Sequence, residues 1–332
     1  MRTILGGGVF TAKNIADINA NFGSVVAGMS LGNVIYCDPS RTNTNTQDGS
    51  AASPYQSLPA AYGAGRSGKN DIIVLVGNGA TGGTARVSAT LTWAKDALHL
   101  VGVCSPVLYS QRARIAVTSG TTAYTPFFTI SGNGCIFQNI AWFMGFGTGT
   151  TNQIGMLLTG SRNYFQNCQI AGLADAESAA DAGSRTLKIG LAGSGENLFE
   201  DCVIGVDTVT RSAANATLEL TAATTRNVFR RCHFPLMTSA ATPLGILGTG
   251  NGCVDRHNTF EECLFINAIK STSTVMTVLA SFTTASPGGM LLFNRSVLVG
   301  VTDYGDTNGL ANSYIDGLTG AAATSGIAVN PS

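Results

Sequence analysis

Charged residues are scarce in this sequence, and their scarcity excludes several classes of partner. Only 11% of the 332 residues are charged, with 19 Lys and Arg against 19 Asp and Glu, and no basic run occurs. Nucleic-acid binding depends on clustered positive charge, so we expect no DNA or RNA partner. An apolar run of about 18 residues, which a membrane-spanning helix needs, is also missing, so we expect no membrane partner.

Signatures of common catalytic and metal sites are equally sparse. The eight cysteines form no CxxC pair or Cys/His spacing typical of zinc, and no Ser/His/Asp signature or phosphate-binding loop is found. The three histidines, His99, His233 and His257, are scattered, and we expect each to be packed or on the surface. The sequence therefore predicts no metal, no cofactor and no catalytic residue.

What the sequence does contain is one short phrase written six times between residues 135 and 298. The phrases are CIFQNIAW, NYFQNCQI, NLFEDCVI, NVFRRCHF, NTFEECLF and LLFNRSVL, and their phenylalanines lie 28, 34, 30, 31 and 33 residues apart. A period of this length is typical of stacked repeats. Each repeat is therefore expected to form one turn of a solenoid.

The columns of the aligned phrases predict the shape of that turn. In a straight strand, the side chains three and five positions after the phenylalanine would point to one face and the phenylalanine to the opposite face. A bend must therefore lie between them if all three are to point into the core. A second apolar run ending in Gly, Ser, Thr or Asn precedes each phrase, and no helical period separates the two. The predicted fold is all-β: a parallel β-helix with a short N-terminal helix.

Aligned columns become ladders when the turns stack about 4.8 Å apart. We predict two interior files and one corner file, the last because Asn tolerates left-handed dihedrals and its amides can bond along the stack. The files are Phe165, Phe199, Phe229 and Phe260; Cys168, Cys202, Cys232 and Cys263; and Asn163, Asn197, Asn227 and Asn258.

The cysteines are expected to remain free thiols. Four of them occupy the same repeat position, which indicates a role in core packing. Their side chains would point in parallel directions, and this disfavours disulfide bonds between them. The start of the chain, MRTILGGGVF, lacks the apolar region and cleavage site of a signal peptide. We therefore expect folding in a reducing cytoplasm.

The N-terminal segment, residues 1–30, has an amphipathic stretch that allows two roles. Ile15, Ile18 and Phe22 are spaced as on one helical face, behind a Thr and before Gly23. The helix either covers the open end of the β-helix or attaches the protein to other proteins. We expect the β-helix over residues 31–301 and a terminal cap or arm over residues 302–332.

Two segments carry a resemblance to known proteins. ADINANFG is similar to a segment near the N-termini of tailed-phage fibre, spike and other virion proteins. The order VIYCDPS, QDGS, SPYQSLPAA and NDIIVLVGNG resembles the opening of pectate-lyase-like parallel β-helix proteins and phage tailspikes, in which the S-P-[FY] turn leads into a short Ala-rich helix. The resemblance implies a right-handed parallel β-helix protein of a tailed bacteriophage virion, assembled in the host bacterial cytoplasm, with Ile15, Ile18 and Phe22 as its virion-attachment residues. It implies little about activity.

Pairs of charged residues in three repeats are the strongest candidates for a functional site. Glu200–Asp201 and Glu261–Glu262 lie one turn on either side of Arg230–Arg231. Stacking would place a basic pair between two acidic pairs, which favours a stabilising charge ladder at an exposed bend. Catalysis by the carboxylates and a contact between subunits are the alternatives.

Three functions are compatible with these observations. The first is a non-enzymatic virion structural protein, a capsid decoration or cement protein, whose partners are the major capsid protein or tail components. The second is a tailspike or tail fibre that binds host polysaccharide, with homo-oligomerisation, as a trimer, expected. The third is a polysaccharide lyase or hydrolase. The low charge and the missing acid pair favour the first, and so predict that the protein is not an enzyme.

Overall fold

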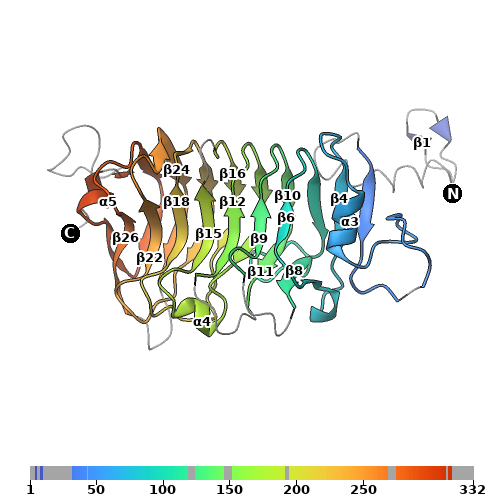
Figure 1. The fold of residues 1–332 in the computed structure, drawn as a ribbon, viewed down its shortest axis with the longest axis horizontal. Coiled ribbons are helices and arrows are strands. Elements are labelled where there is room, and N and C mark those ends of the chain that lie inside the picture. The colour runs from blue at the N-terminus through green and yellow to red at the C-terminus, as the bar shows by residue number, and fades with distance from the viewer. Residues whose placement is uncertain are drawn as a thin grey trace.

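The computed structural model describes residues 4–5, 8–9, 32–42, 44–118, 124–145, 152–190, 194–267, 274–311 and 313–315. It confirms the predicted right-handed parallel β-helix, which winds along one long axis from its N-terminal to its C-terminal end (Figure 1). Three parallel sheets form its walls, one sheet of ten strands and two of eight.

Each strand of a wall pairs with the equivalent strand one turn later. The first sheet contains β3 (Val34–Cys37), β4 (Ile72–Val76), β7 (His99–Val103), β10 (Ile136–Gln138), β13 (Tyr164–Gln166), β16 (Leu198–Glu200), β20 (Val228–Arg230), β24 (His257–Glu261), β27 (Met290–Asn294) and β30 (Ser313–Ile315). The second contains β5 (Ala85–Val87), β8 (Arg114–Val117), β11 (Ala141–Phe143), β14 (Gln169–Ala171), β17 (Val203–Ile204), β21 (His233–Pro235), β25 (Leu264–Ile266) and β28 (Val297–Val299). The third contains β6 (Leu91–Trp93), β9 (Phe128–Ile130), β12 (Ile154–Leu158), β15 (Arg185–Gly190), β18 (Ala216–Thr221), β22 (Leu244–Thr249), β26 (Met276–Phe282) and β29 (Val301–Gly305).

The bend between the first and second sheets follows one residue with positive φ in every repeat. These residues are Asn139, Asn167, Asp201, Arg231, Glu262 and Arg295, with φ between 48° and 55°. A single left-handed residue turns the chain sharply and resets which side of the strand faces inward. This is the bend that the parity of the repeat columns predicts.

Phenylalanines fill the interior of the first sheet. Neighbouring rings of the series from Phe137 to Phe293 stack with centroids 4.4–5.0 Å apart and interplanar angles of 5–13°. Each ring is almost fully buried. The structure thus places the predicted phenylalanines Phe165, Phe199, Phe229 and Phe260 in one continuous stack.

The four repeat cysteines form a second interior file. Each Sγ donates a weak hydrogen bond to the backbone carbonyl of the phenylalanine in the preceding turn, for example Cys202 to Phe165 O at 3.5 Å and Cys232 to Phe199 O at 3.4 Å. The other members of the file are Cys168 and Cys263. All eight cysteines have free thiols, and burial raises the pKa of Cys232.

An asparagine file lies at the corner that enters the first sheet. The backbone N–H of Asn163 donates to Oδ1 of Asn197 at 2.9 Å, and the Asn197 amide donates to Oδ1 of Asn227 at 2.9 Å. Asn227 repeats the same bond to Asn258 at 2.9 Å. Buried corner amides are therefore satisfied by the next turn, as burial of polar groups requires. A small parallel sheet, β19 (Thr224–Thr225) with β23 (Val254–Asp255), extends this corner.

The N-terminal end carries the helix that the S-P-Y turn predicts. Helix α3 (Leu58–Ala64) begins at Ser57, whose side chain accepts a hydrogen bond from the N–H of Ala60, and it buries Leu58 and Ala61. Upstream, β1 (Ile4–Leu5) and β2 (Gly8–Val9) form an antiparallel pair. The proposed attachment residues Ile15, Ile18 and Phe22 lie outside the described residues. Two short helices interrupt later loops, η1 (Thr81–Gly83) and α4 (Ala176–Ala179).

The β-helix continues beyond the predicted boundary at residue 301. Strand β29 pairs with β26, β30 pairs with β27, and α5 (Thr307–Ala311) lies between them in the chain. The tail extends the core because Tyr304 packs on Phe293 with ring centroids 5.2 Å apart and Ile315 lies in register with Phe293. Residues 302–332, predicted to form a terminal cap or arm, therefore add strands to the β-helix as far as Ile315.

Candidate functional site

A row of polar side chains crosses the outer face of the first sheet. Each member follows a stacked phenylalanine by one residue, so strand alternation turns it outward while the ring points inward. Register pairs each member directly with the next. We call this set the polar row: Gln138, Gln166, Glu200, Arg230, Glu261 and Asn294.

Glu200 is the most constrained carboxylate of the polar row. The Tyr164 hydroxyl on the neighbouring strand donates to Glu200 Oε2 at 2.5 Å, and the Arg231 guanidinium lies 2.9 Å from Oε1. The hydrogen bond from Tyr164 and, after it, the charge of Arg231 hold the pKa of Glu200 below its ordinary value. Burial and the Glu200 carboxylate raise the pKa of Tyr164. Glu200 is therefore ionised at neutral pH and faces a phenol that keeps its proton.

The predicted charge pairs meet along the stack. Arg230 binds Glu261 at 2.8 Å through Nε and lies 3.6 Å from Glu200. At the adjacent bend, Arg231 binds Asp201 at 2.7 Å. Glu262 is bound at 2.8 Å by Arg295, one turn further on. These contacts are those of a charge ladder, and each exposed pair stabilises the fold by about 0–1 kcal/mol.

Amide groups form the N-terminal half of the polar row. The Gln138 side-chain N–H donates to the Gln166 carbonyl at 2.8 Å, and the Asn167 amide at the bend donates to Asn139 at 2.6 Å. Sequence reasoning did not single out Gln138, Gln166 or Tyr164. Their signal is positional, because they flank the stacked phenylalanines and strand alternation alone assigns them to the outer face.

These groups suit hydrogen bonding to a sugar chain better than proton donation by a carboxylic acid. Amides and a phenol both donate to and accept from hydroxyls, carboxylates accept from them, and guanidinium groups donate to them. A glycosidase acid needs a raised pKa, whereas that of Glu200 is lowered. The ionised Glu200 can instead act as a nucleophile or a base, beside the donors of Tyr164 and Arg231.

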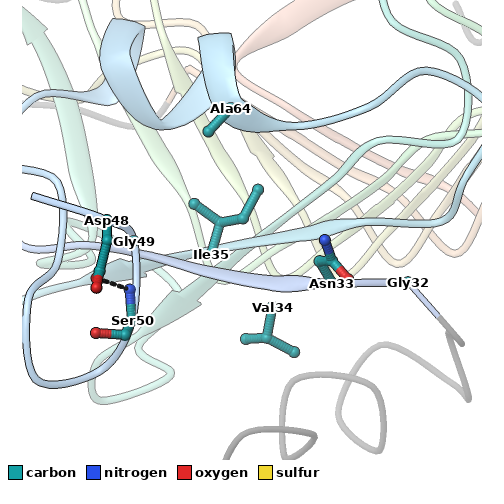
Figure 2. Close-up of a pocket in the computed structure, with 8 residues that line it drawn as sticks. All are labelled: Gly32, Asn33, Val34, Ile35, Asp48, Gly49, Ser50 and Ala64. Atoms are coloured by element: carbon teal, nitrogen blue, oxygen red, sulfur yellow. Dashed lines mark hydrogen bonds between the residues drawn. The ribbon is translucent and has the colours of Figure 1, made fainter.

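A hollow at the N-terminal end of the β-helix has a volume of about 500 Å³ but few reactive groups. Figure 2 shows Ile35 and Val34 pointing to opposite sides of β3, with Asp48 accepting a hydrogen bond from the Ser50 N–H at 2.8 Å. That bond lowers the pKa of Asp48, the one ionisable residue among the described residues of the lining. These described residues therefore provide no acid–base pair.

A second hollow of about 280 Å³ lies at the corner between the third and first sheets. Its charged groups satisfy one another, because Glu196 binds Arg162 at 2.8 Å and Arg226 at 2.6 Å, and Asp255 binds Arg256 at 2.6 Å. The arrangement continues the stacking of opposite charges at a corner.

His99 and His233 do not join the polar row as acid–base groups. His99 is buried, its Nδ1 accepts a hydrogen bond from the Ile136 N–H at 3.1 Å, and burial lowers its pKa. His233 packs edge-on against Tyr109, and burial lowers its pKa too. Over the described ranges, no three His, Cys, Asp or Glu side chains gather closely enough to hold a metal ion. None of the described helices is long and apolar enough to cross a membrane.

Solved structures share this fold across most of their length. A pectin methylesterase mutant in complex with a hexasaccharide has a TM-score of 0.52 at 16% identity, covering 87% of this chain and 92% of that one. Pectin methylesterase from carrot has 0.53 at 12% identity, covering 83% and 82%. A pectate lyase has 0.51 at 11% identity, covering 90% and 83%. No protein-family model matches the sequence, and no curated protein matches it.

These neighbours correct one prediction. The low charge and missing acid pair predicted that the protein is not an enzyme. The proteins that share its fold are, however, named as esterases and lyases, so that prediction was wrong. Low overall charge is therefore no ground for excluding enzymatic activity in this fold. At identities of 11–16% the likeness establishes the fold, and activity has to be argued from the site.

Proposed function

We propose that the protein binds a polysaccharide along the polar row and acts on it there, with Glu200 as the reacting carboxylate. The observation that carries the proposal is the contact set of Glu200, an ionised carboxylate on an exposed sheet that receives hydrogen bonds from Tyr164 and Arg231. Gln138 and Gln166, on the two preceding strands, supply amide groups for substrate hydroxyl or carbonyl oxygens.

The fold of the neighbours supports this choice of ligand. One of them, a pectin methylesterase, was solved with a hexasaccharide, so a β-helix of this kind accommodates a sugar chain in that protein. The repeat distance of the strands, about 4.8 Å, places a hydrogen-bonding side chain at every step of the polar row. A chain ligand could thus contact several turns at once, which suits a polymer better than a small molecule.

The test is a screen of bacterial surface and plant polysaccharides for binding, ester release and chain cleavage. With a substrate in hand, Glu200→Gln is expected to lower turnover by about 10²–10⁴-fold, because the reacting charge is lost while the side-chain volume is kept. Tyr164→Phe is expected to lower turnover less, because it removes one donor to Glu200. Glu262→Gln is the matched control, since Glu262 binds Arg295 at the bend and lies outside the polar row.

Unchanged turnover in Glu200→Gln would contradict the catalytic role and show that Glu200 has only a structural role in the charge ladder. Failure of any polysaccharide to bind the folded protein would reject the ligand class itself. Thermal unfolding of each variant separates loss of activity from loss of fold.

We further propose that this activity serves a tailed-phage virion, as in a tailspike. The support is the resemblance of ADINANFG, and of the segments from VIYCDPS to NDIIVLVGNG, to virion proteins. Mass spectrometry of purified particles is expected to detect the chain, and its absence from them would reject the location. Capsid decoration and a trimeric assembly stay predictions, separable by imaging the particle.

A further inference from the structure

The outer face of the first sheet carries a second row of side chains beside the polar row. Its members lie two residues before those of the polar row on the same strands, so both rows point outward, about 7 Å apart. Register pairs each member with the next, and all are partly exposed. We call this set the apolar stripe, although one member is a threonine: Ile136, Tyr164, Leu198, Val228, Thr259 and Leu292. Figure 1 shows β10, β16 and β24 of this sheet in succession along the axis.

The arginines around these two rows are neutralised by the protein itself. From the corner before β13 to the bend after β27, the described arginines on the first sheet and at its borders each bind a carboxylate at 2.6–2.8 Å. They are Arg162, Arg226, Arg230, Arg231, Arg256 and Arg295, and the carboxylates are Glu196, Glu200, Asp201, Asp255, Glu261 and Glu262. None of the described lysines lies on a strand of this sheet. The arginines are therefore matched one for one by carboxylates.

The two arginines nearest the reacting carboxylate are already engaged. Arg231 binds both oxygens of Asp201, through Nε at 2.7 Å and Nη2 at 2.9 Å, and its Nη2 also binds Glu200 at 2.9 Å. Arg230 binds Glu261 through Nε at 2.8 Å. Charge-assisted bonds of this kind are strong, so a ligand carboxylate would compete with them. It would also bring a second negative charge close to Glu200, whose lowered pKa keeps it ionised.

We propose that the polysaccharide bound along the polar row is a neutral chain, without uronate, phosphate or sulfate groups. A neutral sugar ring has apolar C–H faces, which the apolar stripe can cover, and hydroxyl groups, which the polar row can bind. A surface that combines apolar contact with a few placed polar groups is typical of ligand sites. This inference rests on the proposed function and narrows its substrate class.

The test sorts a panel of polysaccharides by charge and measures their binding by calorimetry. The neutral chains are dextran, mannan and methyl-esterified homogalacturonan, and the acidic chains are carboxymethyl dextran, alginate and polygalacturonate. Titrations are run at about pH 8, well above the ordinary histidine pKa of about 6.5. Within a pair that shares a backbone, such as dextran and carboxymethyl dextran, the neutral chain is expected to bind at least about tenfold more tightly.

A charge variant tests the cause of that preference. Glu261→Gln releases Arg230 from its closest partner and is expected to raise the affinity for the acidic chain, relative to its neutral counterpart, by about tenfold. Glu177→Gln is the matched control, because it removes the same charge from exposed α4, which lies outside the first sheet. This control is expected to leave the ratio of the two affinities unchanged.

The outcomes separate this inference from the proposed function. An acidic chain that binds more tightly than its neutral counterpart overturns the inference, while the polysaccharide site itself stands. If Glu261→Gln and Glu177→Gln change the ratio equally, pairing of Arg230 does not set the preference, and the inference is overturned as well. If no chain of the panel binds the folded protein, the proposed function fails and this inference fails with it.

Discussion

The surroundings of a single interior residue in this protein are set by the equivalent residues of the turns before and after it. Phe199 lies between Phe165 and Phe229, with ring centroids 4.4 and 4.7 Å away, and has no exposed surface. The same side chain at the end of a file would have one such neighbour. The stability that one residue contributes therefore depends on its position in the stack as well as on its type.

We predict that Phe199→Ala lowers the free energy of unfolding by about 3–5 kcal/mol. The substitution removes buried apolar surface and leaves a cavity between two rings that the strand spacing holds apart. Denaturant unfolding of the variant and of the original protein measures the loss. Val228→Ala, on the outer side of the adjacent strand, is the control and is expected to cost much less. Equal losses for the two variants would contradict the interior stack.

At the scale of elements, one buried carboxylate links three neighbouring strands on the outer face of the third sheet. Glu219 on β18 binds Arg185 at 2.7 Å and Lys188 at 3.0 Å on β15, and accepts a hydrogen bond from Thr249 on β22 at 2.9 Å. Burial alone would raise the pKa of Glu219, but Arg185, Lys188 and Thr249 together lower it. Three successive turns are thereby joined outside the backbone ladder.

We predict that this contact makes stability fall in acid. The folded pKa of Glu219 lies below its unfolded value of about 4.3, so its contribution is complete above that pH and is lost as the pH falls through the folded pKa. Urea unfolding between about pH 3 and pH 7 should show the decline, and Glu219→Gln should reduce it. At neutral pH that variant is expected to cost about 3–5 kcal/mol, because Arg185 loses its buried partner.

Glu196, whose ion pairs are more exposed than those of Glu219, is the control for this prediction. Glu196→Gln breaks contacts to Arg162 and Arg226 that are open to solvent, so a cost of only about 0–1 kcal/mol is expected. If both glutamine variants cost the same at neutral pH, burial of Glu219 is not what gives its contacts their strength.

At the scale of the whole molecule, contacts run between adjacent turns. Every pairing in the three sheets joins a strand to the equivalent strand of the next turn, so an interior turn has two neighbours and a terminal turn has one. Such a solenoid is stabilised by each turn and by each interface between turns.

We predict a gradient of amide hydrogen exchange along the axis. Amides of the central strands β16 and β20 are expected to exchange most slowly, and those of β30 faster, because the last turn opens without disturbing the turns before it. Hydrogen exchange followed by mass spectrometry measures this order. Uniform protection from β4 to β30 would show instead that the β-helix opens as a single unit.

The sequence by itself determined the fold and the interior. A period near 30 residues, the parity of its columns and its glycine- and asparagine-rich corners are local properties, and stacking copies at one spacing converts them into files without further information. For that reason Phe165, Cys202 and Asn227 could be assigned from the repeat alone. The alternation of Glu200, Arg230 and Glu261 was visible for the same reason.

Only the tertiary structure decided which side chains outside the repeat meet. Thr84, just before β5, meets Arg114 on β8 and Phe143 on β11 because three turns of unequal loop length bring them together, and unequal loops cannot be aligned from spacing. Tyr304 and Ile315 likewise belong to the core, because Tyr304 packs on Phe293 and Ile315 lies in register with it. The hydrogen bond from Tyr164 to Glu200, which gives the polar row its ionised carboxylate, depends on side-chain geometry between two strands, and no one-dimensional pattern records that geometry.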